Sequence, residues 1–282
     1  MKHFLITGVS SGIGYAGAEA LIGAGHHVFG SVRTADDSAR VMDALGENFT
    51  PLMFDVTDGA AIEAAAAQVE DTIGDNGLAG LVNNAGVGVG GPLMHLTVDE
   101  IRYQFEVNVF GALAVTQAFL PMLGARKPCP HPPGRIVNIS SVAGKIAAPF
   151  VGPYSASKHA LEGLSHALRR ELLLYGVDVV IIGPGSVATP IWDKVDELDV
   201  GRFAGTDYER SLTRFTKGFS AQGRREGLPA KDLGVLIRQV LEDPKPKARY
   251  AIVPNVARNW AIPRVLPPRV LDRIIQRQLF RT

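Results

Sequence analysis

Short aliphatic runs alternate with longer amphipathic stretches along most of this chain. Seven runs are rich in Val, Ile, Leu and Phe, and several are apolar throughout, as strands covered on both faces are. These runs lie at 3–7, 26–32, 50–56, 78–83, 134–140, 177–183 and 249–254. Helical spacing of apolar residues predicts helices at 13–24, 58–74, 97–123, 155–175 and 230–242. The alternation predicts an α/β fold: a doubly wound parallel sheet of about seven strands, with helices on both faces and ligands at the carboxyl ends of the strands.

The chain is expected to form a single domain over residues 1–282, because it contains no long polar or Gly/Ser-rich linker. With 46% hydrophobic and 20% charged residues, it can bury a sizeable core. The single cysteine, Cys129, excludes an internal disulfide, and we expect no metal site. A formal net charge of +1 argues against binding to nucleic acid. Neither a signal peptide nor an apolar run near the ~20 residues that span a bilayer is present, so we expect a cytoplasmic location.

A glycine-rich stretch, TGVSSGIG at 7–14, follows the first predicted strand and opens the first predicted helix. Its glycines, at 8, 12 and 14, leave room for a sharp turn and for the close approach of a pyrophosphate. The start of a helix also offers free N–H groups and the positive end of the helix dipole. The stretch therefore predicts a phosphate-binding loop, and a merely tight connection between strand and helix is the alternative.

Five motifs together resemble the short-chain dehydrogenase/reductase family in its single-domain form. They are the glycine pattern at 7–14, NNAG at 83–86, SS at 140–141, YSASK at 154–158 and PGSVATP at 184–190. The resemblance covers residues 3–190 and extends more loosely to about residue 254. It implies a Rossmann-like fold, a nicotinamide cofactor, and interconversion of an alcohol and a carbonyl on a small molecule. A dinucleotide-binding sensor or scaffold without turnover is the alternative.

Tyr154 and Lys158 stand four residues apart, so on a helix they share one face. A neighbouring ammonium favours the phenolate and can bring the pKa of a tyrosine toward the working pH. The resemblance implies that Tyr154 is the general acid/base and that Lys158 tunes it and binds the nicotinamide ribose. It also implies that Ser141 polarises the substrate oxygen, and that Asn108 holds a water that relays protons to Lys158.

The resemblance also implies a set of cofactor contacts, to which Tyr154 and Lys158 belong. The loop after the first strand would hold the pyrophosphate, the ends of the third and fourth strands the adenosine, and the loop after the sixth strand the nicotinamide. The remaining contacts are Gly8, Ser10, Ser11, Gly12, Ile13, Gly14, Asp55, Val56, Asn84, Ala85, Gly86, Pro184, Gly185, Val187 and Thr189. Asn83, by contrast, is expected to tie two strands together.

The end of the second predicted strand bears on the choice between NAD(H) and NADP(H). A site for NAD offers a carboxylate to the ribose hydroxyls, whereas a site for NADP offers a cation to the 2′-phosphate. Here the strand ends in a neutral residue, Val32, and Arg33 follows at once. NADP(H) is therefore favoured over NAD(H). The alternative is that Asp36 or Asp37 reaches the ribose and Arg33 is a solvated surface residue.

Residues 190–229 leave the regular alternation, and the resemblance implies that they form a lid over the substrate. Within them, Thr206 and Glu209 have the spacing of a helix N-terminal capping box. An aromatic and aliphatic stripe follows, and together with Trp192 and Phe150 it predicts an apolar substrate pocket; plain core packing is the alternative. The stripe consists of Tyr208, Leu212, Phe215 and Phe219.

The C-terminal extension, 255–282, is basic and amphipathic. From Lys245 onward there are nine Lys/Arg and one acid, so this stretch carries a formal charge of about +8, which leaves about −7 on residues 1–244. One side of the predicted helix at 267–282 is apolar, and Arg269, Arg273 and Arg277 lie on the others. Such a helix can lie on an anionic membrane. We favour docking on its own domain or on a sister subunit, and expect a homodimer or homotetramer.

Overall fold

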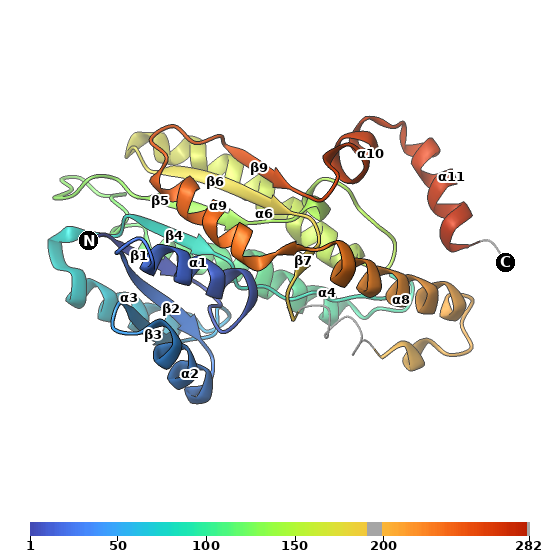
Figure 1. Ribbon diagram of the computed structural model, residues 1–282, viewed down its shortest axis with the longest axis horizontal. Coiled ribbons are helices and arrows are strands. Elements are labelled where there is room, and N and C mark those ends of the chain that lie inside the picture. The colour runs from blue at the N-terminus through green and yellow to red at the C-terminus, as the bar shows by residue number, and fades with distance from the viewer. Residues whose placement is uncertain (191–198, 281–282) are drawn as a thin grey trace.

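The computed structural model describes residues 1–190 and 199–280, and its centre is one parallel sheet (Figure 1). The strands have the order β3-β2-β1-β4-β5-β6-β9, and each neighbouring pair is parallel. Their bounds are β1 His3–Ile6, β2 His27–Val32, β3 Phe49–Met53, β4 Gly80–Asn83, β5 Arg135–Ile139, β6 Asp178–Pro184 and β9 Arg249–Ile252. Each overlaps one of the seven predicted runs, with β3 beginning one residue before its run and β6 ending one residue after its run. The predicted α/β, Rossmann-like doubly wound fold is confirmed.

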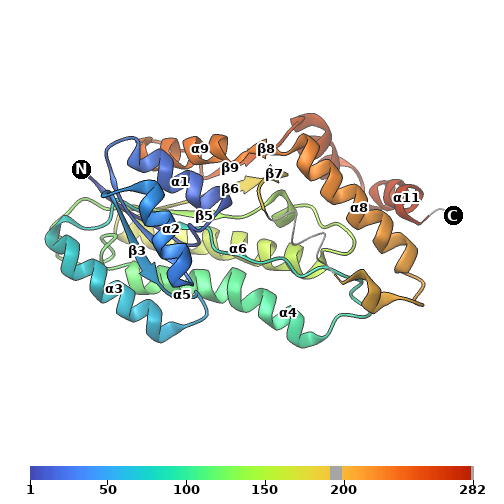
Figure 2. The ribbon, with the colours of Figure 1, turned by 60° about the horizontal axis from the view of Figure 1, so that its bottom comes forward.

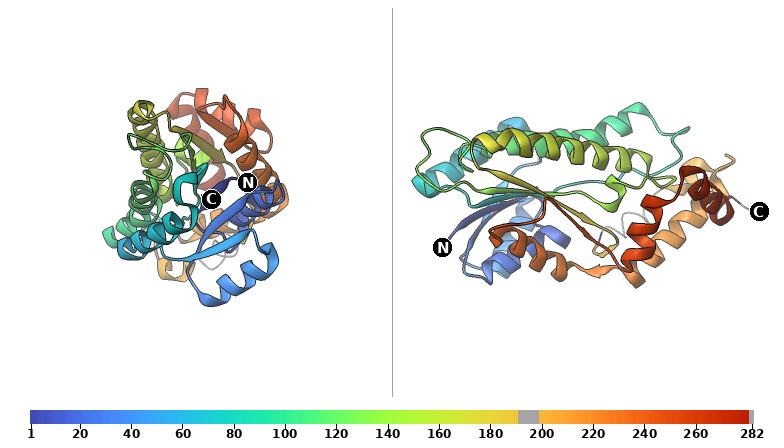
Figure 3. Two further views of the ribbon diagram at one scale, coloured as in Figure 1. Left: turned by 90° about the vertical axis from the view of Figure 1, so that its left-hand side faces the viewer. Right: turned by 90° about the horizontal axis from the view of Figure 1, so that it is seen from above.

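Helices cover both faces of the sheet, as Figure 3 shows. On one face lie α1 (Gly12–Ile22), α2 (Ala35–Leu45) and α9 (Ala230–Glu242), and on the other α3 (Gly59–Ile73), α5 (Ala112–Phe119) and α6 (Gly152–Glu171). Successive strand residues point to opposite faces. Leu5 and Leu81 therefore belong to the core under α3 and α5, whereas Ile6 and Val82 belong to the core under α1 and α9. This two-sided burial explains why the strand sequences are apolar throughout.

Two predicted helices differ from expectation in the structure. The stretch 97–123 begins with the capping box of Thr97 and Glu100, but it is divided into α4 (Val98–Phe105), a π-helical turn η2 (Glu106–Gly111) and α5. Helix α6 begins at Gly152 rather than 155, so Tyr154 lies in its first turn. Helix α2 was not predicted, because its sequence is largely polar and Val41 is its one buried residue.

Residues 199–229 form the part of the predicted lid that the structure describes. A 3₁₀ turn, η5 (Val200–Phe203), precedes α8 (Glu209–Glu226), and two short strands, β7 (Val187–Ala188) and β8 (Leu228–Pro229), pair in parallel at its base. The predicted capping box is wrong: α8 begins at Glu209, whose carboxylate accepts from the Gly205 N–H at 2.7 Å, while Thr206 donates to Phe203 O.

The C-terminal extension contains a π-helical turn η6 (Ala257–Ala261), α10 (Ile262–Val265) and α11 (Pro268–Leu279). Three short 3₁₀ turns complete the fold, at η1 (Gly74–Asn76), η3 (Val142–Gly144) and η4 (Leu172–Leu174). Helices α8, α10 and α11 gather at the end of the molecule toward which the strands run (Figures 1 and 2). Among the described residues, no helix is long and apolar enough to cross a membrane.

Candidate active site

The first two turns of α6 carry the tyrosine and lysine of the YSASK motif. Lys158 is buried, and its ammonium Nζ donates to the Ile139 carbonyl at the end of β5, at 2.9 Å. The same nitrogen lies 5.7 Å from the centre of the Tyr154 ring. The helix therefore brings the phenol and the ammonium together at the carboxyl end of β5, as predicted from their spacing.

Ser141 follows β5 and completes the cluster. Its hydroxyl accepts from the Ala143 N–H at 3.1 Å and donates to the Pro184 carbonyl at 3.4 Å. The Ser141 side chain is also close enough to the Tyr154 phenol to influence its pKa. Because Ser141 lies between the loop after β6 and the phenol, its hydroxyl and the Tyr154 hydroxyl can approach one substrate oxygen together.

Burial shifts both titratable groups toward their neutral forms. It raises the pKa of the Tyr154 phenol, an effect that the Ser141 side chain opposes, and it lowers the pKa of Lys158 to about 8. The net shift of Tyr154 is thus opposite to the one expected from the ammonium alone, because desolvation of the buried phenol is its largest cause. A protonated phenol is the form that can donate a proton.

Asn108 lies in the π-helical turn, a feature that is frequent at functional sites. Its Oδ1 accepts from the Val87 N–H at 2.9 Å, and its Nδ2 donates to Val87 O at 3.0 Å and to the Ser157 hydroxyl at 3.1 Å. Asn108 therefore fixes the loop after β4 against the turn of α6 that carries Lys158. Its predicted water relay to Lys158 stays a prediction.

The glycine loop has the shape that a dinucleotide phosphate needs. Gly8 and Gly12 have φ values of 72° and 62°, which favour glycine. A Cβ on Gly14 would lie 2.2 Å from Gly8 O and 2.5 Å from Asn84 Nδ2. Asn84 itself donates to the Thr7 and Gly8 carbonyls at 2.9 and 3.0 Å. The Asn84 side chain thus fixes the glycine loop through two of its carbonyls. The absence of a side chain at Gly14 lets the first turn of α1 pack directly on Gly8.

The first turn of α1 is open to an anion. Its N-cap, Ser11, makes no side-chain capping bond to the described residues, and the turn contains no acidic residue. Helices α2, α3 and α4 are capped by Thr34, Asp58 and Thr97. Thr189, in the loop after β6, lies against this loop, since a Cβ on Gly12 would be 3.3 Å from its methyl group. These residues fit a phosphate between the two loops.

Arg33 and Asp55 meet at the expected adenosine end. Asp55 accepts from the N–H and the hydroxyl of Thr57 at 2.9 and 2.8 Å, and Arg33 Nη1 lies 3.7 Å from its other oxygen. Burial alone would raise the pKa of Asp55, but these partners lower it overall. Asp37, the alternative ribose ligand, is paired with Arg40, which also donates to Ser10 O at 2.8 Å. Sequence reasoning missed Arg40, since α2 was not predicted.

A second missed feature is a buried ion cluster behind Ser141. The Glu162 carboxylate accepts from Arg249 Nη2 at 2.8 Å, from Lys145 Nζ at 2.8 Å and from the Ser140 hydroxyl at 3.0 Å. Arg249 also donates to the Ser141 carbonyl at 3.4 Å. No local pattern could reveal it, because Arg249 lies 87 residues from Glu162 in the chain. The cluster fixes the backbone on which Ser141 stands.

An apolar cluster lies beside this site at the lid. Its buried members are Leu96, Phe150, Phe203 and Leu212, and Tyr208 and Phe215 pack against them. Phe150, four residues before Tyr154, has a φ of 65°, a strained backbone for a bulky residue. The predicted stripe of α8 is thus largely packed against the body, including the stacked pair Phe215 and Phe219 with ring centres 5.0 Å apart. Trp192, also predicted to line the pocket, lies outside the described residues.

Asn83 has the structural role expected of it: it is buried and donates to Thr116 and Asn138 at 2.8 and 2.9 Å. Thr7, at the end of β1, was missed; its hydroxyl accepts from the Asn84 and Ala85 N–H groups at 2.9 and 3.0 Å. The segment 84–86 is thereby held beside the glycine loop. The other predicted contacts lie on the segments that follow β1, β3, β4 and β6, and their binding to a cofactor stays a prediction; they are Ser10, Ile13, Val56, Gly86, Gly185 and Val187.

Comparisons with known proteins agree with this geometry. The model of the short chain dehydrogenase family matches residues 2–199. An NADPH-dependent 3-dehydrocapnine reductase of Ornithobacterium rhinotracheale is 39% identical over 99% of this chain and 98% of its own length. A 3-ketodihydrosphingosine reductase of Bacteroides thetaiotaomicron is 34% identical over 89% of this chain and 88% of its own length. A short chain dehydrogenase/reductase of Burkholderia phymatum, solved with NAD, superposes with a TM-score of 0.77 and 28% identity, covering 100% of this chain and 97% of that one.

The buried ion cluster predicts a large effect of Glu162→Gln. Removing one partner of a buried pair leaves uncompensated charge, so the free energy of unfolding should fall by about 3 kcal/mol at neutral pH. The pKa of Glu162 is lowered, chiefly by Arg249 and Lys145 against the effect of burial, so its contribution is lost as the pH falls through that value. Urea denaturation measures both. The exposed pair of Asp99 with Arg102 supplies the control, and a loss no greater than that of Asp99→Asn would contradict the prediction.

The lowered pKa of Lys158 predicts how the free energy of unfolding changes with pH. Its folded-state pKa of about 8 is below the ordinary 10.5, so the folded protein releases this proton first and gains stability as the pH rises between the two values. The free energy of unfolding should rise by about 3 kcal/mol in the wild type relative to Lys158→Met over this interval. Lys247→Met, at an exposed lysine, is the control. A difference curve that stays flat would refute the assignment.

Proposed function

This chain belongs to the short-chain dehydrogenase family, and from that membership we propose that it interconverts an alcohol and a carbonyl on a hydrophobic substrate with a nicotinamide dinucleotide. The observation that carries the proposal is the convergence of Ser141, Tyr154 and Lys158 beside the glycine loop. Three polar side chains from two elements meet there, and each has the chemistry that the reaction needs.

The Ser141 hydroxyl and the Tyr154 phenol bind the substrate oxygen. In reduction Tyr154 gives its proton to the oxygen as the carbonyl carbon gains a hydride, and in oxidation the phenolate accepts the proton of the alcohol. When bound, the nicotinamide ring supplies or takes up that hydride. The proton and the hydride together account for the two hydrogens by which alcohol and carbonyl differ.

Lys158 stabilises the phenolate that each turnover leaves or requires. Its ammonium is already desolvated and lies against the Tyr154 ring, so its charge acts through a medium of low dielectric constant. Asn108 holds the loop after β4 and the Ser157 hydroxyl in place. We assign it to the support of Lys158 and to the predicted proton relay.

The cofactor is proposed to be NADP(H) in preference to NAD(H). Arg33 is 63% exposed at the end of β2, beside Asp55, and can turn toward a 2′-phosphate. Asp37, the competing acid, is paired with Arg40. One close relative is named as NADPH-dependent, which supports the preference, although a related structure holds NAD.

The substrate is proposed to be hydrophobic. Phe150, four residues before Tyr154, belongs to the apolar cluster at the lid, and a relative is named for 3-ketodihydrosphingosine. A cytoplasmic location and a homodimer or homotetramer stay predictions. Exposed apolar side chains near the groove between α5 and α6, Phe110 and Leu164 among them, support self-association.

Tyr154→Phe tests the function. The variant should bind NADPH as the wild type does, but lose about 10²–10⁴-fold in kcat on a hydrophobic ketone, because it lacks the proton donor. Absorbance of the reduced cofactor measures turnover, and fluorescence measures binding. Tyr103→Phe removes the same hydroxyl from an exposed position and should leave both unchanged. Cofactor binding without turnover of any alcohol or carbonyl by the wild type would instead favour a sensor.

Arg33 tests the cofactor preference. Arg33→Ala should raise the KM for NADPH about tenfold and leave that for NADH unchanged, because a charge-assisted contact to the 2′-phosphate is lost. Arg33→Lys should restore part of the preference. Arg102→Ala, at another exposed arginine paired with an aspartate, is the control. Equal KM values for the two cofactors in the wild type would sink the proposal.

A further inference from the structure

The C-terminal segment, residues 255–280, carries an apolar surface that the rest of the protein leaves uncovered. Six large apolar side chains are exposed on η6, α10 and α11 or directly beside them, a density that single chains rarely show unless the surface binds something. They are Val256 (55%), Ile262 (49%), Val265 (79%), Val270 (37%), Ile274 (38%) and Phe280 (43%). Helix α11 has no buried residue.

Positive charge accompanies this surface. Arg269, Arg273 and Arg277 follow one line along α11 at four-residue steps, and Val270 and Ile274 form the adjacent line. The acid of the helix, Asp272, makes only an exposed contact with Arg269 at 3.4 Å. Arg258 and Arg264 add to the same segment. The segment thus has the two features, exposed aliphatic side chains and flanking arginines, that place an amphipathic helix at a bilayer interface.

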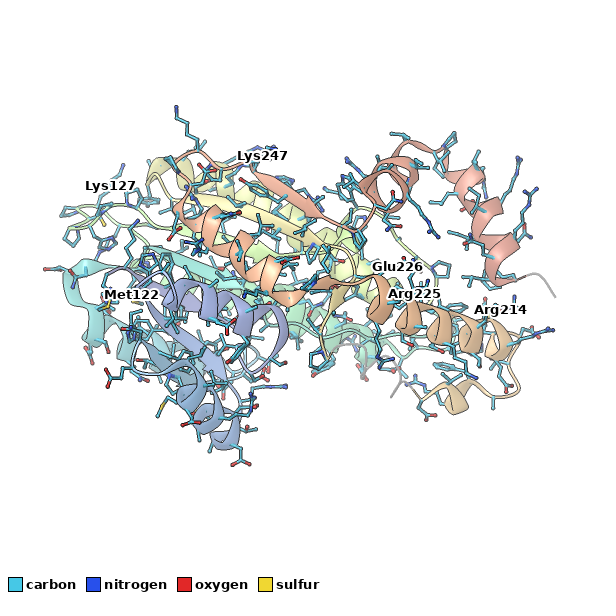
Figure 4. All side chains as sticks on the ribbon, in the orientation of Figure 1. Met122, Lys127, Arg214, Arg225, Glu226 and Lys247 are labelled. Atoms are coloured by element: carbon cyan, nitrogen blue, oxygen red, sulfur yellow. The ribbon has the colours of Figure 1, made fainter. Side chains whose placement is uncertain are left out.

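The C-terminal end of α11, at Leu279 and Phe280, contacts the rest of the protein. Leu279 packs on the apolar cluster at the lid, and its carbonyl accepts from Arg214 of α8 at 3.3 Å; Figure 4 shows Arg214 at that end of α8. The Phe280 ring lies 6.1 Å from that of Phe150. The sequence analysis favours docking on the same chain, and this docking accounts for the contacts of Leu279 and Phe280. The outer line of α11, Val270 and Ile274, stays exposed.

We propose that this outer line, with its arginines, binds the surface of a bilayer that contains anionic lipids. A second copy is the competing occupant, but a two-fold contact would bring two strongly positive segments together, and the arginine rows would repel each other. An anionic surface complements the same charge and strengthens binding about fivefold for each arginine close to it. The aliphatic side chains would enter the headgroup boundary without any helix crossing the membrane.

The position of the segment gives this surface a further meaning, which rests on the proposed function. Helices α8, α10 and α11 gather beyond the carboxyl ends of the strands (Figures 1 and 2), and Ser141 and Tyr154 follow the carboxyl end of β5 in the chain. Phe150, four residues before Tyr154, contacts Phe280 of this segment and Phe215 of α8. A hydrophobic substrate held in the bilayer would thus be presented on the side of the protein that receives it.

Flotation of the full chain with vesicles tests the proposal. The probes are vesicles of phosphatidylcholine alone and vesicles with about one third phosphatidylserine. Binding should be at least tenfold tighter to the anionic vesicles and should weaken as salt rises. Arg273→Gln/Arg277→Gln should lose about 25-fold, and Val270→Asp/Ile274→Asp should lose at least as much. Arg102→Gln and Leu173→Asp, at exposed positions outside the segment, should bind as the wild type does.

Three results would overturn the proposal: no binding to either vesicle, equal binding to both, or binding that the segment variants leave intact. Light scattering supplies a fourth: a smaller assembly for Val270→Asp/Ile274→Asp would show that a second copy covers the face. Turnover of a short, water-soluble ketone by the same variants separates this proposal from the enzymatic one. Vesicle binding without turnover would sink only the proposed function, and turnover without vesicle binding would sink only this inference.

Discussion

The attachment of α6 to β5 is the constraint on which the candidate site depends. Three polar side chains of α6, on successive turns of its buried face, bond to residues 138–140 at the carboxyl end of the strand. The pairs are Ser165 with Asn138, Lys158 with Ile139 O, and Glu162 with Ser140. Because the helix cannot slide or rotate without breaking all three, the first turn of α6 and the residue after the strand keep a fixed relation. Tyr154 and Ser141 owe their proximity to this attachment.

The same attachment sets the electrostatics. It buries Lys158 without a carboxylate partner, so that burial lowers its pKa, and it buries Glu162 among cations, which lower its pKa as well. Lys158, whose pKa is lowered to about 8, thus lies one helical turn from Glu162, whose lowered pKa keeps it ionised at neutral pH. Because Arg249 and Lys145 already neutralise the Glu162 carboxylate, it stabilises the Lys158 ammonium only weakly. The charge of Lys158 can therefore stabilise the negative charge that develops on Tyr154.

Sequence patterns predicted the features that depend on local periodicity or on residues close together in the chain. The strands are apolar because both faces are covered, and the glycines at 8, 12 and 14 are needed by the backbone itself, so both could be read directly. Helix α2 could not, because it buries little more than Val41 and its polar sequence resembles a loop. The π-helical turn at Asn108 and the pairing of Glu162 with Arg249 depend on tertiary packing between distant segments, for which one sequence contains no periodic signal.

A net charge of +1 conceals a strong division along the chain, with about −7 on residues 1–244 and about +8 on the remainder. An anionic cofactor must therefore bind to a body of like charge, which requires local groups, namely the open turn of α1, Arg33 and Arg40, rather than the overall field. The same division would orient the molecule near an anionic surface, since the body is repelled and the C-terminal segment attracted. That orientation would place the carboxyl ends of the strands toward that surface, since the C-terminal helices lie at the same end of the molecule.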